Sequence, residues 1–101
     1  MAAVRPLKLG FSERARSQLL AIQSYVKERN PAAARRVGSA IREAGERLRY
    51  FPFAGRIGAS EGTREWVVRE YPYILVYEIR SDEVTILGVF HAAQDHSEDE
   101  G

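Results

Sequence analysis

Histidine, arginine and tyrosine side chains in the C-terminal half are the residues whose types could act on a phosphate. His91 can titrate near neutral pH, arginines can hold phosphate oxygens through paired N–H donors, and tyrosines can stack on bases or donate a proton. RNA cleavage through a 2′-hydroxyl needs a base, an acid and cations on the phosphate, so these residues form a candidate catalytic set. The arginines are Arg56, Arg64, Arg69 and Arg80, and the tyrosines are Tyr71, Tyr73 and Tyr77.

The same residues also have structural explanations. Arg64 and Arg69 can pair across strands with glutamates at positions 65, 70 and 78. The tyrosines suit a hydrophobic core or a sheet surface, and a histidine at the end of a strand is commonly held by hydrogen bonds. Arg56 stands beside loop glycines, where exposure and function are equally good explanations.

Composition narrows the classes of protein to consider. A chain of 101 residues suffices for one domain, and the lack of cysteine excludes disulfides, a thiol nucleophile and cysteine-containing metal sites. We expect no cofactor and no metal site. The N-terminus lacks the apolar run of a signal peptide, and no stretch approaches the roughly 18 apolar residues of a membrane span, so we expect a cytoplasmic protein.

Charge is segregated along the chain. The last ten residues carry four acids and no lysine or arginine, and without those four acids the chain has 15 basic and 10 acidic residues, a net charge of +5 over residues 1–91. We therefore predict one domain over residues 1–95, followed by a flexible acidic tail over residues 96–101.

The N-terminal half predicts a strand and two helices. Residues 4–11 alternate as a short strand, and Ser12 is a suitable N-cap for a helix over residues 13–29. Asn30 and Pro31 end this helix and start the next, so a connection this short predicts an antiparallel helical hairpin. The apolar stripes are Ala15, Leu19, Ile22 and Val26 in the first helix and Ala34, Val37, Ile41, Ala44 and Leu48 in the second.

The C-terminal half predicts a loop and three strands. Residues 50–63 form the loop, and we expect its aromatic residues to tuck beneath it and cap one end of the core. Strands at 64–70, 73–80 and 83–91 are joined by turns and form an antiparallel meander, with the last strand central because both its faces are apolar. The predicted fold is α+β with the order β-α-α-β-β-β, a helical hairpin packed on a small antiparallel sheet.

Several local phrases in this order resemble the RelE/ParE toxin superfamily of type II toxin–antitoxin systems. The resemblance runs from about Leu7 to Asp95, and no single phrase is specific, but all occur in order in a chain of the right length. The phrases are Phe11-Ser12-Glu13-Arg14-Ala15, the P-x-x-G-R loop Phe51-Pro52-Phe53-Ala54-Gly55-Arg56, Thr63-Arg64-Glu65-Trp66-Val67-Val68, Pro72-Tyr73-Ile74-Leu75-Val76-Tyr77, and the last strand with its ending His91-Ala92-Ala93-Gln94-Asp95.

The resemblance implies one of two targets. RelE-like members are ribosome-dependent mRNA endoribonucleases, which here would use His91 with Arg64 or Arg69, whereas ParE-like members bind and poison DNA gyrase. The ribonuclease branch carries a cluster of lysine and arginine on its middle strands, but the lysines here are only Lys8 and Lys27. The H-x-A-x-D ending also resembles the ParE branch, so we predict a gyrase inhibitor, with the ribonuclease as the alternative. An inactive remnant of the fold is a third possibility.

The resemblance also implies a protein partner. A cognate antitoxin, ParD-like or similar, would neutralise the toxin as a hetero-oligomer by placing a segment on an edge strand or in the groove beside the helical hairpin. DNA would be contacted only through the antitoxin, and no membrane is involved. We predict target- or antitoxin-binding roles for Arg56, Arg64, Arg69, Tyr73, Tyr77 and His91.

Overall fold

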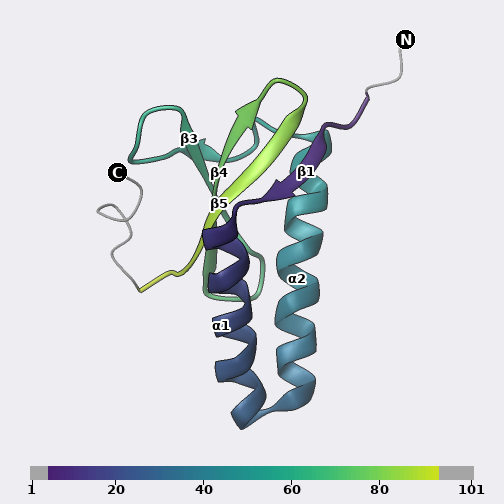
Figure 1. Cartoon of the computed structure of the whole chain (residues 1–101), viewed down its shortest axis with the longest axis vertical. Helices are drawn as coiled ribbons and strands as arrows, with labels where there is room; N and C mark the ends of the chain where they lie inside the picture. Colours follow the sequence, from purple (N-terminus) through teal and green to yellow (C-terminus); the bar gives the residue numbers. More distant parts are fainter. Residues whose placement is uncertain (1–4, 94–101) are drawn as a thin grey trace.

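A helical hairpin lies against one face of a five-stranded sheet in the computed structural model, which describes residues 5–93 (Figure 1). The order along the chain is β1 (Lys8–Phe11), α1 (Glu13–Arg29), α2 (Pro31–Tyr50), β2 (Arg56–Ile57), β3 (Thr63–Val67), β4 (Tyr73–Arg80) and β5 (Glu83–His91). The tail predicted over residues 96–101 lies outside the described residues. Within residues 5–93, no helix is long and apolar enough to span a bilayer.

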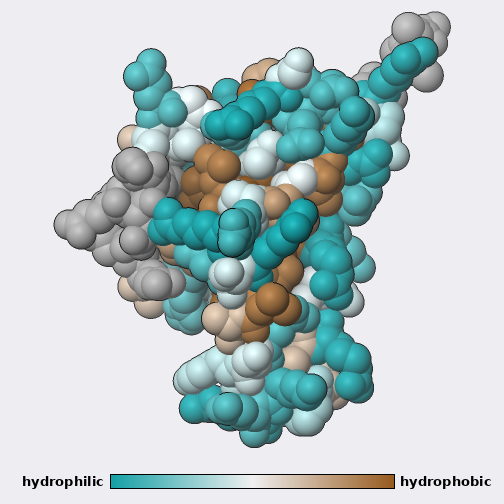
Figure 2. Space-filling view, viewed as in Figure 1, coloured by the Kyte–Doolittle hydropathy of each residue, from teal (hydrophilic) through white to brown (hydrophobic). Residues whose placement is uncertain are grey.

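Both helices begin where the sequence predicts, because polar side chains cap them. The Ser12 hydroxyl accepts from the amide of Ala15 at 3.0 Å, and the Asn30 side chain accepts from the amide of Ala33 at 3.1 Å. The predicted stripe of α2 is buried throughout, and in α1 only Ala15 is fully buried. The hairpin end with Asn30 projects away from the sheet, and hydrophilic side chains cover much of it (Figures 1 and 2).

The sheet is mixed rather than antiparallel, which corrects the prediction. The strand order is β1-β5-β4-β3-β2; the last three predicted strands form the expected meander, but β1 pairs with β5 in parallel. The apolar alternation of residues 7–11 fixes which side chains face the core, and it carries no information on strand direction. β5 is an interior strand as predicted, with β1 on one side and β4 on the other.

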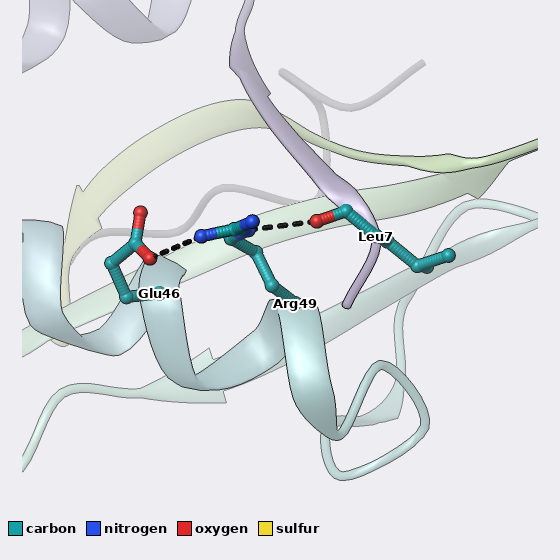
Figure 3. A network of polar contacts seen from close by, with 3 residues as sticks. All are labelled: Leu7, Glu46 and Arg49. Carbon is teal, nitrogen blue, oxygen red and sulfur yellow. Dashed lines mark hydrogen bonds and ion pairs between the residues drawn. The ribbon is translucent and has the colours of Figure 1, made fainter. Parts of the chain in front are cut away.

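A polar contact fastens the start of β1 to the end of α2. The amide of Leu7 donates to the carbonyl of Arg49 at 3.0 Å, and Arg49 Nε donates back to the carbonyl of Leu7 at 2.7 Å. Glu46 holds the same guanidinium through an ion pair of 2.7 Å (Figure 3). The end of α2 thus satisfies the backbone amide and carbonyl of Leu7, just before β1, on the edge where no further strand pairs.

The predicted loop over residues 50–63 contains a short strand and exposes its aromatic residues. β2 pairs with β3 through Arg56–Glu65 and Ile57–Arg64, a two-residue ladder too short for an alternation pattern to indicate. Phe51 and Phe53 are 62% and 70% exposed, so the expectation that they cap the core was wrong. Tyr77, which is fully buried, lies beneath this loop instead, with its hydroxyl bonded to the backbone of Pro52 and Gly55.

Two strands differ in detail from the prediction. β3 ends at Val67 rather than at residue 70, because Glu70 takes a positive φ of 69° in the turn and the amide of Val68 donates to the carbonyl of Tyr73. The β4–β5 register shifts opposite Val76 and Tyr77, leaving Leu87 as an extra residue in β5.

The bulge changes which side chains of β5 face the helices. Val84 and Ile86 belong to the core cluster, and beyond the bulge Val89 joins it, whereas Gly88 and Phe90 are buried outside that cluster. Helix α1 satisfies the disturbed backbone, because Ser12 donates to the carbonyl of Leu87 and Gln18 accepts from the amide of Val89 at 2.9 Å. A regular two-residue alternation of cluster residues therefore holds only as far as Ile86.

Candidate functional site

The predicted site residues separate into two groups at different positions along β4. Tyr73 begins this strand opposite His91, and Arg69 lies in the turn just before it. Tyr77 lies four residues farther along, opposite Arg64, and Arg64 is followed by the Arg56–Glu65 pair on β2 and β3. Four residues of a strand span about 13 Å, at about 3.3 Å per residue. The structure therefore does not gather the six residues into one centre.

The first group surrounds the aromatic ring of Tyr73. This ring is 8% exposed and meets the His91 ring edge to face, with 5.7 Å between centroids. His91 Nδ1 accepts a hydrogen bond from the amide of Ala93 at 3.1 Å, which fixes the orientation of the imidazole. Burial raises the pKa of Tyr73 and the nearby Tyr25 adds to the rise, so Tyr73 is a neutral phenol at physiological pH.

The second group is a hydrogen-bond network that holds the loop between α2 and β2. The buried hydroxyl of Tyr77 donates to the carbonyl of Pro52 at 2.7 Å and accepts from the amide of Gly55 at 2.9 Å. Arg64 donates to the carbonyls of Phe53 and Gly55 at 3.3 and 2.7 Å. Gly55 is needed here because a Cβ atom would lie 2.5 Å from the Tyr77 hydroxyl.

Burial raises the pKa of Tyr77, although the Gly55 hydrogen bond and the charge of Arg64 act in the opposite direction. The phenol is therefore neutral at physiological pH and is committed to two backbone partners. Its side chain is 0% exposed, so a partner at the surface cannot contact it in this conformation. We therefore assign Tyr77 a structural role, in which its hydroxyl holds the loop between α2 and β2 in place.

Arg56 pairs with a buried carboxylate. Its Nε and an Nη atom lie 3.1 and 2.9 Å from the same oxygen of Glu65, whose side chain is 7% exposed. The Glu65 carboxylate is largely excluded from water, and a buried carboxylate without a cation is strongly destabilising. Arg56 therefore has a structural role at this position. The expected partner of Glu65 was Arg64 or Arg69, and the structure instead assigns it Arg56.

A groove beside the helical hairpin was predicted as a possible antitoxin site, and the structure has one between α2 and the β3–β4 turn. It arises because the hairpin packs mainly on β5 and β1, which leaves the helix-facing side of β3 partly uncovered. Its volume is about 620 Å³. The lining residues are Ala32, Arg35, Arg36, Ser39, Ala40, Glu43, Ala44 and Arg47 from α2 and Trp66, Val68, Arg69, Glu70 and Tyr71 from the other wall.

The groove is apolar at its base and positive at its edges. Trp66 and Tyr71 are the largest apolar side chains of the lining, and four arginines against two glutamates give the lining a net charge of +2. The arginines of α2 are exposed except for Arg49, and three of them, Arg35, Arg36 and Arg47, border this groove. In the sequence these three arginines flank the buried apolar stripe of α2, and this spacing is the feature that indicates a groove wall.

Comparison with known proteins places this architecture in a family. The sequence model described as the ParE toxin of the type II toxin–antitoxin system parDE matches residues 9–96. The chain is 39% identical over 87 residues to the protein Y4kP of Sinorhizobium fredii, which is named as a toxin, covering 86% of this chain and 90% of that one. It is 35% identical over 81 residues to toxin RelE2 of Caulobacter vibrioides, covering 80% and 90%.

Solved structures agree on the fold. A chain of the chromosomal ParDE system from P. aeruginosa superposes with a TM-score of 0.77 at 22% identity, over 84% of this chain and 95% of that chain. A chain of the toxin–antitoxin complex RelBE2 from Mycobacterium tuberculosis superposes with a TM-score of 0.61 at 26% identity, over 93% and 100%. With its family model matched over most of the chain, the protein belongs to the ParE toxin family of the RelE/ParE superfamily, the toxins of type II toxin–antitoxin systems.

Proposed function

We propose that this toxin arrests growth by binding DNA gyrase and that a cognate antitoxin neutralises it by occupying the groove along α2. The observation that carries the gyrase proposal is the separation of His91 from Arg64 along β4, with the Arg64 guanidinium engaged by two backbone carbonyls. A ribonuclease requires its base and its cations at a single phosphate. A protein-binding inhibitor requires only a complementary surface.

The groove has the chemistry expected of an antitoxin site. A segment that gains order on binding could lay apolar side chains on Trp66 and Tyr71 while its carboxylates meet Arg35, Arg47 and Arg69 at the edges. Similarity to the ParDE system and to the RelBE2 toxin–antitoxin complex supports a partner of this kind. We therefore expect an acidic, amphipathic segment as the occupant.

The gyrase proposal is tested with purified toxin, gyrase and relaxed plasmid. We expect the toxin to inhibit ATP-dependent supercoiling and to trap cleaved plasmid, and addition of the antitoxin to restore supercoiling. Gyrase that remains fully active in a large excess of folded toxin would contradict the proposal.

The groove is tested by charge reversal. The double variant Arg47→Glu/Arg69→Glu should bind the antitoxin at least about tenfold more weakly in calorimetry, because both positions turn from attracting carboxylates to repelling them. The matched control is Arg16→Glu, an exposed arginine of α1 that does not line the groove. Equal affinities of the two variants for the antitoxin would reject the groove as the site.

A ribosome-dependent endoribonuclease is the second candidate, and the 35% identity to toxin RelE2 favours it. On this hypothesis the base is His91, and Arg69 is the nearer of the two candidate cations because it lies at the same end of β4. Primer extension after induction would reveal new 5′ ends in mRNA, and His91→Ala would abolish them. Growth arrest without new 5′ ends would eliminate this candidate.

A further inference from the structure

Three large apolar side chains at one corner of the molecule are exposed to solvent. Phe51, Phe53 and Ile57 are 62%, 70% and 73% exposed, and we name them with Arg64 the aromatic corner. Arg64 lies over the Phe53 ring, with 5.1 Å from its guanidinium carbon to the ring centroid. Ile57 is directly opposite Arg64 in the β2–β3 ladder, so the two side chains share one face of the sheet.

The segment that presents these side chains is tightly held. The Tyr77 hydroxyl binds the backbone at Pro52 and Gly55, and Arg64 binds the carbonyls of Phe53 and Gly55. The amide of Ala54 also donates to the carbonyl of Phe51 at 3.1 Å. A segment fixed in this way loses little conformational entropy on binding, so it can contribute affinity efficiently.

We infer that the aromatic corner is the surface that engages the toxin's cellular target, and that the target offers an apolar pocket bordered by carboxylates. This inference rests on the proposed function, in which the toxin acts by binding a protein. Exposed aromatic side chains beside arginine have the composition of binding hot spots. Within residues 5–93, no carboxylate lies within ion-pair distance of Arg64, so its positive charge is available to an acidic rim.

The corner is separate from the antitoxin groove. None of its four residues lines the groove, whose wall on the sheet side begins at Trp66 and whose α2 wall ends at Arg47. The toxin therefore presents two different surfaces, one of mixed apolar and arginine character along α2 and one dominated by phenylalanine beyond the end of that helix. Substitutions can separate target binding from antitoxin binding.

Charge argues against other occupants. A symmetric dimer through this corner would bring the two Arg64 charges together. Nucleic acid requires several available cations, but Arg56 is paired with Glu65 and Arg49 with Glu46. An acidic protein pocket remains the best match.

The test compares the double variant Phe51→Ser/Phe53→Ser with the control Leu20→Ser, which removes a side chain 64% exposed on α1. Each is induced without antitoxin, and each is purified for antitoxin binding and thermal melting. We expect the double variant to need at least about ten times more toxin than the wild type to arrest growth, with antitoxin affinity unchanged and the control fully toxic. Equal arrest by the double variant and the wild type, or no arrest by either, would overturn the inference.

Two further measurements sharpen the outcome. Ile57→Glu should impair growth arrest more than Ile57→Lys, because glutamate would face the acidic rim; equal effects would overturn the acidic pocket. If the wild type binds a single-stranded oligonucleotide and the double variant does not, the corner binds nucleic acid, and the inference of a protein target is overturned.

A further outcome separates this inference from the gyrase proposal. If the wild type arrests growth but leaves purified gyrase active, and the double variant is harmless, the gyrase proposal fails. The aromatic corner is then still the target-binding surface, but for a protein other than gyrase.

Discussion

Replacing Tyr77 with phenylalanine tests whether one buried hydroxyl holds the loop between α2 and β2. The substitution leaves the ring in place, so no large cavity forms, and it removes one donor and one acceptor. The amide of Gly55 then loses a bond of 2.9 Å and the carbonyl of Pro52 one of 2.7 Å. Leaving a buried polar group without its partner costs about 1–3 kcal/mol, and water can reach Pro52, which is only half-buried.

We therefore expect Tyr77→Phe to lower the free energy of unfolding by about 2 kcal/mol, which corresponds to a fall in Tm of roughly 8–16 °C for a domain of this size. Calorimetry or circular dichroism melting would measure it. The control is Tyr25→Phe, which removes a hydroxyl from a residue 59% exposed and should change the Tm little. A Tm of Tyr77→Phe equal to that of the wild type would refute the role assigned to this hydroxyl.

Three further predictions concern stability. Gly55→Ala should lower the free energy of unfolding by about 1–3 kcal/mol, because its Cβ would lie 2.5 Å from the Tyr77 hydroxyl and 2.8 Å from the Glu65 carbonyl. In a double-mutant cycle, Gly55→Ala combined with Tyr77→Phe should lower it by less than the sum of the two single effects. Ser12→Ala should cost more than Asn30→Ala in chemical denaturation, about 2 against about 1 kcal/mol, because Ser12 caps α1 and also binds the Leu87 carbonyl. Burial raises the pKa of Tyr73 and Tyr77 above 10.0. The stability that these neutral phenols contribute is therefore complete below pH 10 and is lost as the pH rises through their folded pKa values. The Tm should fall over that alkaline range, and it should fall less steeply in Tyr77→Phe.

The helices could be predicted almost to the residue because their signals are local. Ser12 caps the first helix, while Asn30 and Pro31 define the junction, and each acts through groups within three residues. The buried stripe of the second helix follows from spacing alone. Gly45 and Gly38 of this helix lie against Leu9 of β1 and Gln23 of α1, where an added Cβ atom would meet those side chains.

The sheet was predictable in its faces but not in its pairing. Tyr73, Leu75 and Tyr77 alternate in β4 and all belong to the core, whereas in β5 the alternation of core residues breaks after Ile86. The bulge at Leu87 depends on Ser12 and Gln18 of α1, which are about 70 residues away in sequence. Contacts of this range leave no periodic trace in the strand itself.

The candidate site shows the same division between local and distant causes. Arg64, Tyr73, Tyr77 and His91 lie on strands as predicted, whereas Arg56, predicted in the loop, lies in β2. The network that commits Tyr77 to Pro52 and Gly55 depends on a fold-level contact. The groove is also a property of packing, since it exists only because the hairpin rests on β5 and β1 and leaves Trp66 half-covered. Sequence therefore indicated the residues, and the structure determined which of them are available.

The commitment of Arg64 bears directly on the choice between the two proposed targets. Its guanidinium donates to the carbonyls of Phe53 and Gly55, and a scissile phosphate would have to compete for donors on the same group. Breaking hydrogen bonds from a charged donor costs about 1.5–3 kcal/mol each, and it would also release the backbone that presents Phe53. Both bonds come from one Nη atom, so a phosphate that displaced them would loosen the aromatic corner, whereas apolar docking on Phe51, Phe53 and Ile57 leaves them intact. Target binding through these apolar side chains needs no rearrangement of Arg64, so the gyrase-type mechanism demands less of this fold than RNA cleavage through that Nη atom does.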